Sequence, residues 1–188
     1  MTTATKPPIT KFNLAARLLH WSMAVMVIAQ FFIGVTMIAA LSYYPLLLAI
    51  HRPLGIAILV FAIVRLVNRL TRRLPPFLKT MGPVERRVAS YSEYLLYALL
   101  LVQPLIGWAM LSAAQSPIVL FGALHLPAIA PHNITLYAAL RTAHTVAAYL
   151  LFATFTAHIC AVLFHGLVLR DGIIRRMSLW PGRNHLDE

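Results

Sequence analysis

The sequence contains one cysteine, Cys160, and few charged side chains of any kind. A single cysteine excludes a disulfide within the chain and any metal site built from several thiolates. Charged residues make up 11% of the chain and hydrophobic residues 60%, whereas a soluble domain has about 25% and about 45–50%. This composition argues against a water-soluble globule.

Acidic residues are the scarcest charged group. Five Asp and Glu against 16 Lys and Arg leave a formal net charge of +11, which on a soluble chain would suggest nucleic-acid binding. Because the chain is so apolar, a lipid bilayer is the better partner, and we expect no contact with nucleic acid.

Four apolar runs reach the length of about 20 residues that a transmembrane helix needs. We expect one domain over residues 1–188, an all-α integral membrane four-helix bundle with a cytoplasmic tail at 170–188. The first run is too long for a signal peptide and lacks a small-residue cleavage site, so no removable leader is expected. The predicted spans are Leu14–Leu41, Pro45–Val67, Tyr91–Ser112 and Leu140–Leu169.

The connections between the spans differ in composition. Fourteen of the 16 basic residues lie in the N-terminal region, in the connection after the second span or in the C-terminal tail, and only Arg52 and Arg141 lie elsewhere. Basic residues of short loops stay in the cytoplasm, so both termini are predicted to be cytoplasmic. The apolar stretch from Gln115 to Thr135 is expected to lie along the opposite membrane interface as a short helix or a folded cap.

Five histidines fall within the predicted spans, where ionisable side chains are costly and usually face the bundle interior. Taken singly, each could be a structural histidine hydrogen-bonded across a helix interface. His144 and His158 are 14 residues apart, which places them within about 40° of one helix face and about 21 Å apart along the axis. The five are His20, His51, His144, His158 and His165.

Because successive spans cross the membrane in opposite directions, four of these histidines fall at two depths, two at each depth. His20 pairs with His158 toward the cytoplasmic side, and His51 with His144 toward the outer side. Two facing imidazoles at each depth are typical of bis-histidine haem ligation in a helix bundle, whereas zinc or copper more often gathers three or four ligands at one depth. The sequence therefore predicts two haem irons.

Small and basic residues share the faces of these histidines. Gly34 lies at the outer depth and Gly55 one turn from His51, where they would leave room for a flat macrocycle or serve close helix contact. Arg65 lies at the inner depth, where it would pair with haem propionates or anchor the helix at the interface. The third span, with Gln103, Pro104, Gly107 and Trp108, is interpreted as a packing helix that could wall a cofactor or quinone.

The chain resembles the bacterial cytochrome b561 family, which is related to the diheme cytochrome b subunits of membrane-bound hydrogenases. The elements that carry the resemblance are Leu19-His20-Trp21, His51 with Gly55, the segment from Arg65 to Arg69, Phe121-Gly122 followed by Pro127, and His144 with His158 and His165.

The resemblance implies two b haems held by the same two histidine pairs, in a protein of the bacterial inner membrane. It also implies electron transfer between the quinone pool, expected to be ubiquinone, and an outer partner. In relatives described as superoxide oxidases, that partner is superoxide.

His165 lies seven residues beyond His158 and closer to the cytoplasm. Histidine titrates near neutral pH and suits proton exchange, so His165, assisted by Lys79, is a candidate for protonating a quinone beside the inner haem. The alternative is a histidine at headgroup level with a structural role.

Three functions remain open. The first is a self-contained oxidoreductase that moves electrons from superoxide to a quinone. The second is an electron-transfer subunit of a hydrogenase or dehydrogenase complex, with a separate redox protein as donor. The third is a histidine-lined metal or proton transporter, which would be colourless when purified.

The two outer arginines favour superoxide as the donor. No Asp or Glu lies in the two outer connections, so Arg52 and Arg141 would attract a small anion to the outer haem. Alternatively, both arginines bind propionates of that haem.

The basic residues generate a prediction about orientation. Both termini should face the cytoplasm, because 14 basic residues lie on that side and two on the other. A C-terminal fusion to a reporter that is active only in the cytoplasm should be active. If the tail instead lies on the outer side, the donor and acceptor sides are reversed.

Overall fold

The structure is a computed structural model and describes residues 11–78, 80–120, 122 and 124–180. Four helical segments are long and apolar enough to cross a membrane, which confirms the predicted all-α membrane four-helix bundle. The elements, in chain order, are α1 Leu14–Ala39, η1 Leu41–Tyr43, α2 Tyr44–Thr71, α3 Pro83–Ala113, β1 Val119–Leu120, β2 Leu124–His125, α4 Ile134–Leu163, the π-helical η2 Phe164–Leu169 and α5 Ile173–Met177.

Two of the helices begin well before the apolar runs that predict them, whereas α1 ends at Ala39, two residues short of the predicted Leu41. α3 begins at Pro83 rather than Tyr91, and α4 begins at Ile134 rather than Leu140. Hydropathy marks only the part of a helix that crosses hydrocarbon, whereas backbone hydrogen bonding continues until a capping residue ends it.

Side-chain caps fix where three of the helices start. Asn13 Oδ1 accepts from the Ala16 N–H at 2.8 Å, and Asn133 Oδ1 accepts from the Leu136 N–H at 2.9 Å. At the start of α3 the Glu85 carboxylate accepts from the Gly82 N–H at 2.7 Å. Such caps satisfy backbone donors that the first helical turn leaves free.

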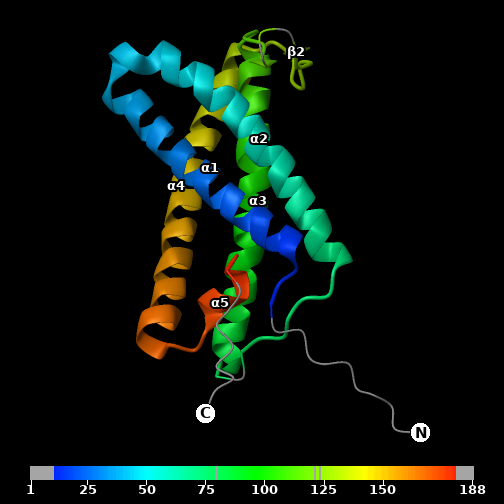
Figure 1. Cartoon of the computed structure of the whole chain (residues 1–188). Coiled ribbons are helices and arrows are strands. Elements are labelled where there is room, and N and C mark those ends of the chain that lie inside the picture. The colour runs from blue at the N-terminus through cyan, green and yellow to red at the C-terminus, as the bar shows by residue number, and fades with distance from the viewer. Residues whose placement is uncertain (1–10, 79, 121, 123, 181–188) are drawn as a thin grey trace, which may run out of the picture.

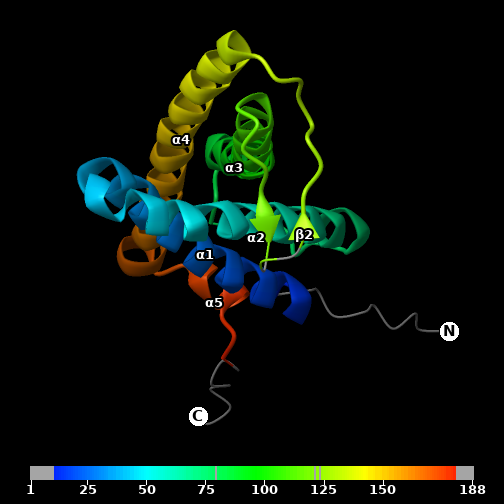
Figure 2. The same ribbon diagram turned by 90° about the horizontal axis from the view of Figure 1, so that it is seen from above.

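The four long helices form two antiparallel hairpins, α1 with α2 and α3 with α4. The hairpins cross at an angle rather than lying parallel (Figures 1 and 2). An ion pair ties α2 to α3: Arg69 Nε lies 2.7 Å from Glu93 Oε1, and Arg69 Nη2 donates to Oε2 at 2.8 Å. We call the end that carries η1 and the two strands the loop end, and the opposite end, which carries α5, the tail end (Figure 1).

The loop after α3 folds over the loop end. β1 pairs with β2 in a short antiparallel ladder, so the described part of this loop forms strands and not the short helix that was one expectation. Trp108 Nε1 donates to the Pro127 carbonyl at 2.9 Å, and Ser112 Oγ accepts from the Ile129 N–H at 3.1 Å. These bonds hold the loop against α3 over a cavity of about 430 Å³.

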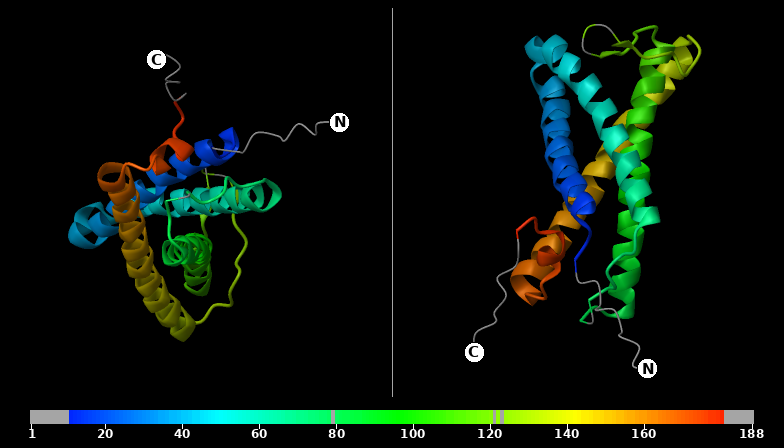
Figure 3. Two further views of the ribbon diagram at one scale, coloured as in Figure 1. Left: turned by 90° about the horizontal axis from the view of Figure 1, so that it is seen from below. Right: turned by 45° about the vertical axis from the view of Figure 1, so that its right-hand side comes forward.

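The segment after α4 folds back beneath α1 at the tail end (Figure 3). Arg17 Nη1 donates to the Ser178 carbonyl at 2.7 Å, and Trp21 Nε1 donates to the Met177 carbonyl at 2.9 Å. Arg176 donates to the Pro76 carbonyl from the same segment. α5 is thereby tied both to the start of α1 and to the connection between α2 and α3.

Candidate haem sites

The histidine pair near the loop end lies between the two hairpins. The ring centroids of His51 in α2 and His144 in α4 are 6.3 Å apart, with an angle of 69° between the ring planes. The Nδ1 atoms of both rings are buried without a hydrogen-bond partner. Buried polar atoms nearly always have a partner in native proteins, so these rings indicate a group that the polypeptide does not itself supply.

This separation fits two imidazoles that share one metal ion. Imidazole nitrogens bind metal ions at about 2 Å, so rings at this separation would leave room for one metal ion between them. His51 and His144 would therefore be the residues that hold the iron of one b haem, which would supply one-electron transfer.

The second histidine pair lies toward the tail end. His20 in α1 lies close enough to His158 in α4 and to Arg65 in α2 for direct electrostatic interaction, and Arg65 also interacts with His158. The Nδ1 atom of His20 is buried without a hydrogen-bond partner. A second pair of histidines thus lies on helices of the two different hairpins, toward the other end of the bundle, with a guanidinium beside it.

Glycines give the loop-end imidazoles their space. A Cβ atom on Gly107 of α3 would lie 3.1 Å from His144 Cε1, which is closer than ordinary contact, and one on Gly34 of α1 would lie 4.0 Å from His51 Cε1. Gly34 thus lies beside His51 in the structure. Gly107 belongs to the span interpreted as a packing helix that could wall a cofactor or quinone, and it constrains the ring of His144 more tightly than Gly34 constrains His51.

Two glutamines brace the helices that carry the loop-end pair. Gln30 Nε2 in α1 donates to the His51 carbonyl at 3.1 Å, and Gln103 Nε2 in α3 donates to the His144 carbonyl at 3.0 Å. A Cβ atom on Gly55 would lie 3.5 Å from Gln30 Nε2, an ordinary contact distance, so Gly55 lies beside this bond. Sequence reasoning missed Gln30, although its position one turn before Gly34 was a signal.

Aromatic and basic side chains meet beside the tail-end pair. The Arg65 guanidinium lies 5.6 Å from the ring centroid of Tyr97 in α3, and that of Arg69 lies 5.8 Å from Tyr94. Tyr97 is only 8% exposed. These cation–π contacts orient Arg65 toward the bundle, which agrees better with a partner inside the bundle than with an anchor at the lipid interface.

The two arginines near the loop-end pair have different surroundings. Arg52 is half-buried and donates to Ser116 Oγ at 3.1 Å, while its Nε atom is buried without a partner. It also interacts electrostatically with His51. Arg141 is exposed on α4, three residues before His144. Arg52 is thus directed into the protein and Arg141 lies on its surface.

His165 lies in the π-helical turn at the tail end and contacts a carboxylate. Its Nδ1 atom is 2.5 Å from Asp171 Oδ2, and both side chains are largely buried, at 13% and 3% exposure. Lys79, its suggested helper, lies outside the described residues. Asp171 was missed because nothing in the sequence indicates that the chain turns back toward His165 at that point.

Apolar side chains separate the two histidine depths. The ring of Phe31 in α1 lies 5.5 Å from the rings of both Phe152 and Phe155 in α4. No Asp, Glu, Lys, Arg or His lies between the two depths in α1, α2 or α4, which are residues 21–33, 53–64 and 145–157. In the described part of the chain, no three His, Cys, Asp or Glu side chains gather as a metal site.

Comparison with known proteins agrees with this arrangement. The family model for prokaryotic cytochrome b561 matches residues 11–179, so the chain belongs to the prokaryotic cytochrome b561 family. It is a multi-pass membrane protein of electron transport that carries b-type haem.

Two relatives are described more specifically. A protein of Yersinia pestis named "Probable superoxide oxidase CybB" is 31% identical over 160 residues, covering 85% of this chain and 90% of the relative. "Cytochrome b561 homolog 2" of Escherichia coli (strain K12) is 27% identical over 125 residues, covering 63% of this chain and 64% of the relative.

The paired depths generate a prediction about cofactor content. The purified protein should contain two b haems, and His51→Ala or His144→Ala should remove mainly one while His20→Ala or His158→Ala removes mainly the other. Absorption spectra and haem-to-protein ratios measure this. A correctly folded wild-type protein with a single haem, or none, would contradict the assignment.

The close approach of Gly107 to His144 generates a second prediction. Gly107→Ala should displace the His144 ring, because the new Cβ atom would lie 3.1 Å from His144 Cε1. The variant should therefore bind less of the loop-end haem or show a shifted spectrum for it. Gly34→Ala is the matched control, since its Cβ would meet His51 at an ordinary 4.0 Å. Equal effects of the two substitutions would contradict the crowding argument.

Proposed function

We propose that this protein is a diheme cytochrome b that passes electrons from superoxide at its outer face to ubiquinone near its inner face. The observation that carries the proposal is the pair of imidazole sites at two depths, with the loop-end centroids 6.3 Å apart. The name of the relative from Yersinia pestis supports superoxide as donor. In this proposal the loop end is periplasmic and the tail end cytoplasmic, in a bacterial inner membrane.

The ligands in this proposal are His51 and His144 for the outer haem and His20 and His158 for the inner haem. Bound b haems supply reversible one-electron transfer. The protein's part is to hold them at fixed depths: Gln30 and Gln103 secure the helices that carry the outer pair. Arg65 lies where it would bind a propionate of the inner haem.

The two outer arginines divide the roles that the sequence left open. Arg141 is exposed and would raise the local concentration of an anion such as superoxide. Arg52 is half-buried beside His51 with an unpartnered Nε, so a propionate of the outer haem is its better partner. Neither role requires a docked protein.

At the inner face the reaction consumes protons. Two superoxide ions give two O₂ and two electrons, and ubiquinone takes up these electrons with two protons to form ubiquinol. His165 is the proposed proton donor. It is seven residues, or about 10 Å of helix, beyond His158, and it lies at the tail end where cytoplasmic protons would enter.

A test of the outer reaction is stopped-flow reduction of the purified holoprotein by superoxide at several ionic strengths. Arg141→Gln should slow reduction about two- to fivefold at low salt, and added salt should abolish the difference, because screening removes steering. Arg52→Gln should instead lower the outer haem content. Arg87→Gln, at the tail end, is the matched control and should leave the rate unchanged.

Other outcomes would change the assignment. A salt-independent rate with unaltered Arg141→Gln kinetics would remove the steering role. No reduction by superoxide at all would indicate a docked hydrogenase, dehydrogenase or other redox protein as donor.

A further inference from the structure

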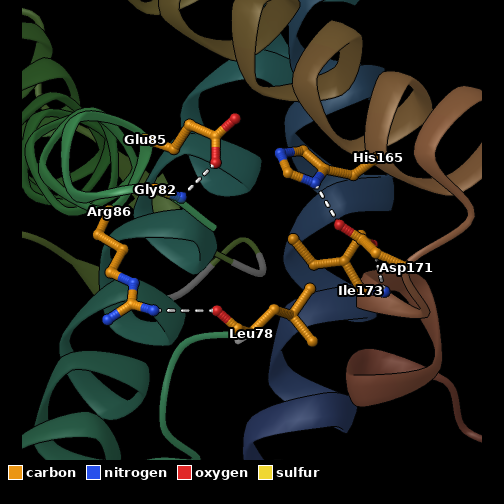
Figure 4. A network of polar contacts seen from close by, with 7 residues as sticks. All are labelled: Leu78, Gly82, Glu85, Arg86, His165, Asp171 and Ile173. Atoms are coloured by element: carbon orange, nitrogen blue, oxygen red, sulfur yellow. Dashed lines mark hydrogen bonds and ion pairs between the residues drawn. The ribbon is translucent and has the colours of Figure 1, made fainter. Parts of the chain in front are cut away.

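Asp171 contacts His165 at the tail end. The carboxylate lies in the turn between η2 and α5, and its two oxygens have different partners (Figure 4). Oδ2 lies 2.5 Å from His165 Nδ1, and Oδ1 accepts from the Ile173 N–H at 3.1 Å. The carboxylate is therefore held by the backbone on one side and holds the imidazole on the other.

Local backbone geometry brings Asp171 to this position. Arg170 has a φ of 51° and Gly172 a φ of 80°, so left-handed residues flank Asp171 on both sides and reverse the chain. The Asp171 N–H also donates to the His165 carbonyl at 3.3 Å. A left-handed arginine is uncommon, and here it coincides with a π-helical turn, a feature frequent at functional sites.

The contact fixes which ring nitrogen of His165 is free. A carboxylate oxygen can only accept a hydrogen bond, so Nδ1 must carry the hydrogen. The second nitrogen, Nε2, points away from Asp171 (Figure 4).

We propose that Asp171 is the positioning residue of the quinone-reducing site, and that it makes Nε2 of His165 the atom that exchanges protons with the quinone. This inference rests on the proposed function. In each protonation step the Nε2–H bond breaks and an O–H bond forms on the quinone oxygen. The neutral ring keeps its hydrogen on Nδ1, and Nε2 takes the next proton from cytoplasmic water. The two electrons come from two superoxide ions.

Four variants of the full-length holoprotein separate this role from a purely structural one: Asp171→Asn, His165→Leu, the double variant and Glu85→Gln. Glu85 is the matched control, because it is a tail-end carboxylate that bonds the Gly82 N–H and not His165 (Figure 4). The measurement is stopped-flow reoxidation of the superoxide-reduced protein by short-chain ubiquinone, with thermal stability and haem spectra recorded for each variant.

Asp171→Asn should lower the maximal reoxidation rate about ten- to a hundredfold with little change in the quinone concentration at half-maximal rate. The rate at which superoxide reduces Asp171→Asn should equal the wild-type rate. Glu85→Gln should be reoxidised by ubiquinone at the wild-type rate. The double variant should be no slower than His165→Leu, because Asp171 acts through His165. If adding Asp171→Asn to His165→Leu lowers the reoxidation rate by the same factor as it does in the wild-type chain, Asp171 has a structural role and the inference is overturned.

The outcomes also separate this inference from the proposed function. If His165→Leu is slow and Asp171→Asn reacts at the wild-type rate, only the role of Asp171 fails. If His165→Leu itself reacts at the wild-type rate, the proposed proton donor is wrong, and the inference fails with it.

A measurement on the wild-type chain keeps the inference testable if Asp171→Asn does not fold. Nitrogen-15 NMR of the histidine rings in the dithionite-reduced protein reports which nitrogen carries the hydrogen, with the His165 signal assigned from its absence in His165→Leu. The neutral ring should carry it on Nδ1. A hydrogen on Nε2 of the neutral ring would overturn the inference.

Discussion

Inside a bilayer, polar groups must find their partners within the protein, because hydrocarbon offers none. This constraint explains the hydrogen bonds that secure the spans. Gln30 and Gln103 donate to carbonyls of the histidine-bearing turns, and the Thr154 hydroxyl donates to a carbonyl of its own helix. Among the buried side-chain atoms without a partner in the described residues are Nδ1 of His20, His51 and His144, and a bound b-type haem would explain why these rings are not tied to the polypeptide.

Haem would also account for the loose relation between the two hairpins. Within the described residues, α1 packs along α2 and α3 along α4 more extensively than the hairpins pack on each other. Contacts between the hairpins include Arg69 with Glu93 and Phe31 with Phe152. Each histidine pair takes one member from each hairpin. A metal bound by such a pair therefore joins the hairpins, so cofactor binding and helix assembly are expected to be coupled.

Much of this arrangement could be predicted from the sequence, because depth along a helix follows from counting residues. The spacing of His144 and His158 and the direction of the spans were enough to pair four histidines. What could not be predicted depends on helix rotation and on the path of loops. Gly107 meets His144 only through the way α3 packs on α4, and Asp171 reaches His165 only because the chain reverses at Arg170. Amino-acid composition predicts neither of these two contacts.

The apolar layer between the two histidine depths has a consequence for the membrane itself. It contains the phenylalanine contacts between α1 and α4 and lacks Asp, Glu, Lys, Arg and His in α1, α2 and α4, so no chain of acids and bases connects the two faces there. In the proposed diheme arrangement electrons would pass between the two depths, whereas no acid or base of α1, α2 or α4 would carry protons through this layer. In the proposed direction, each turnover moves negative charge inward without a compensating ion and draws its protons from the cytoplasm. Detoxification of superoxide would thus add to the membrane potential rather than dissipate it.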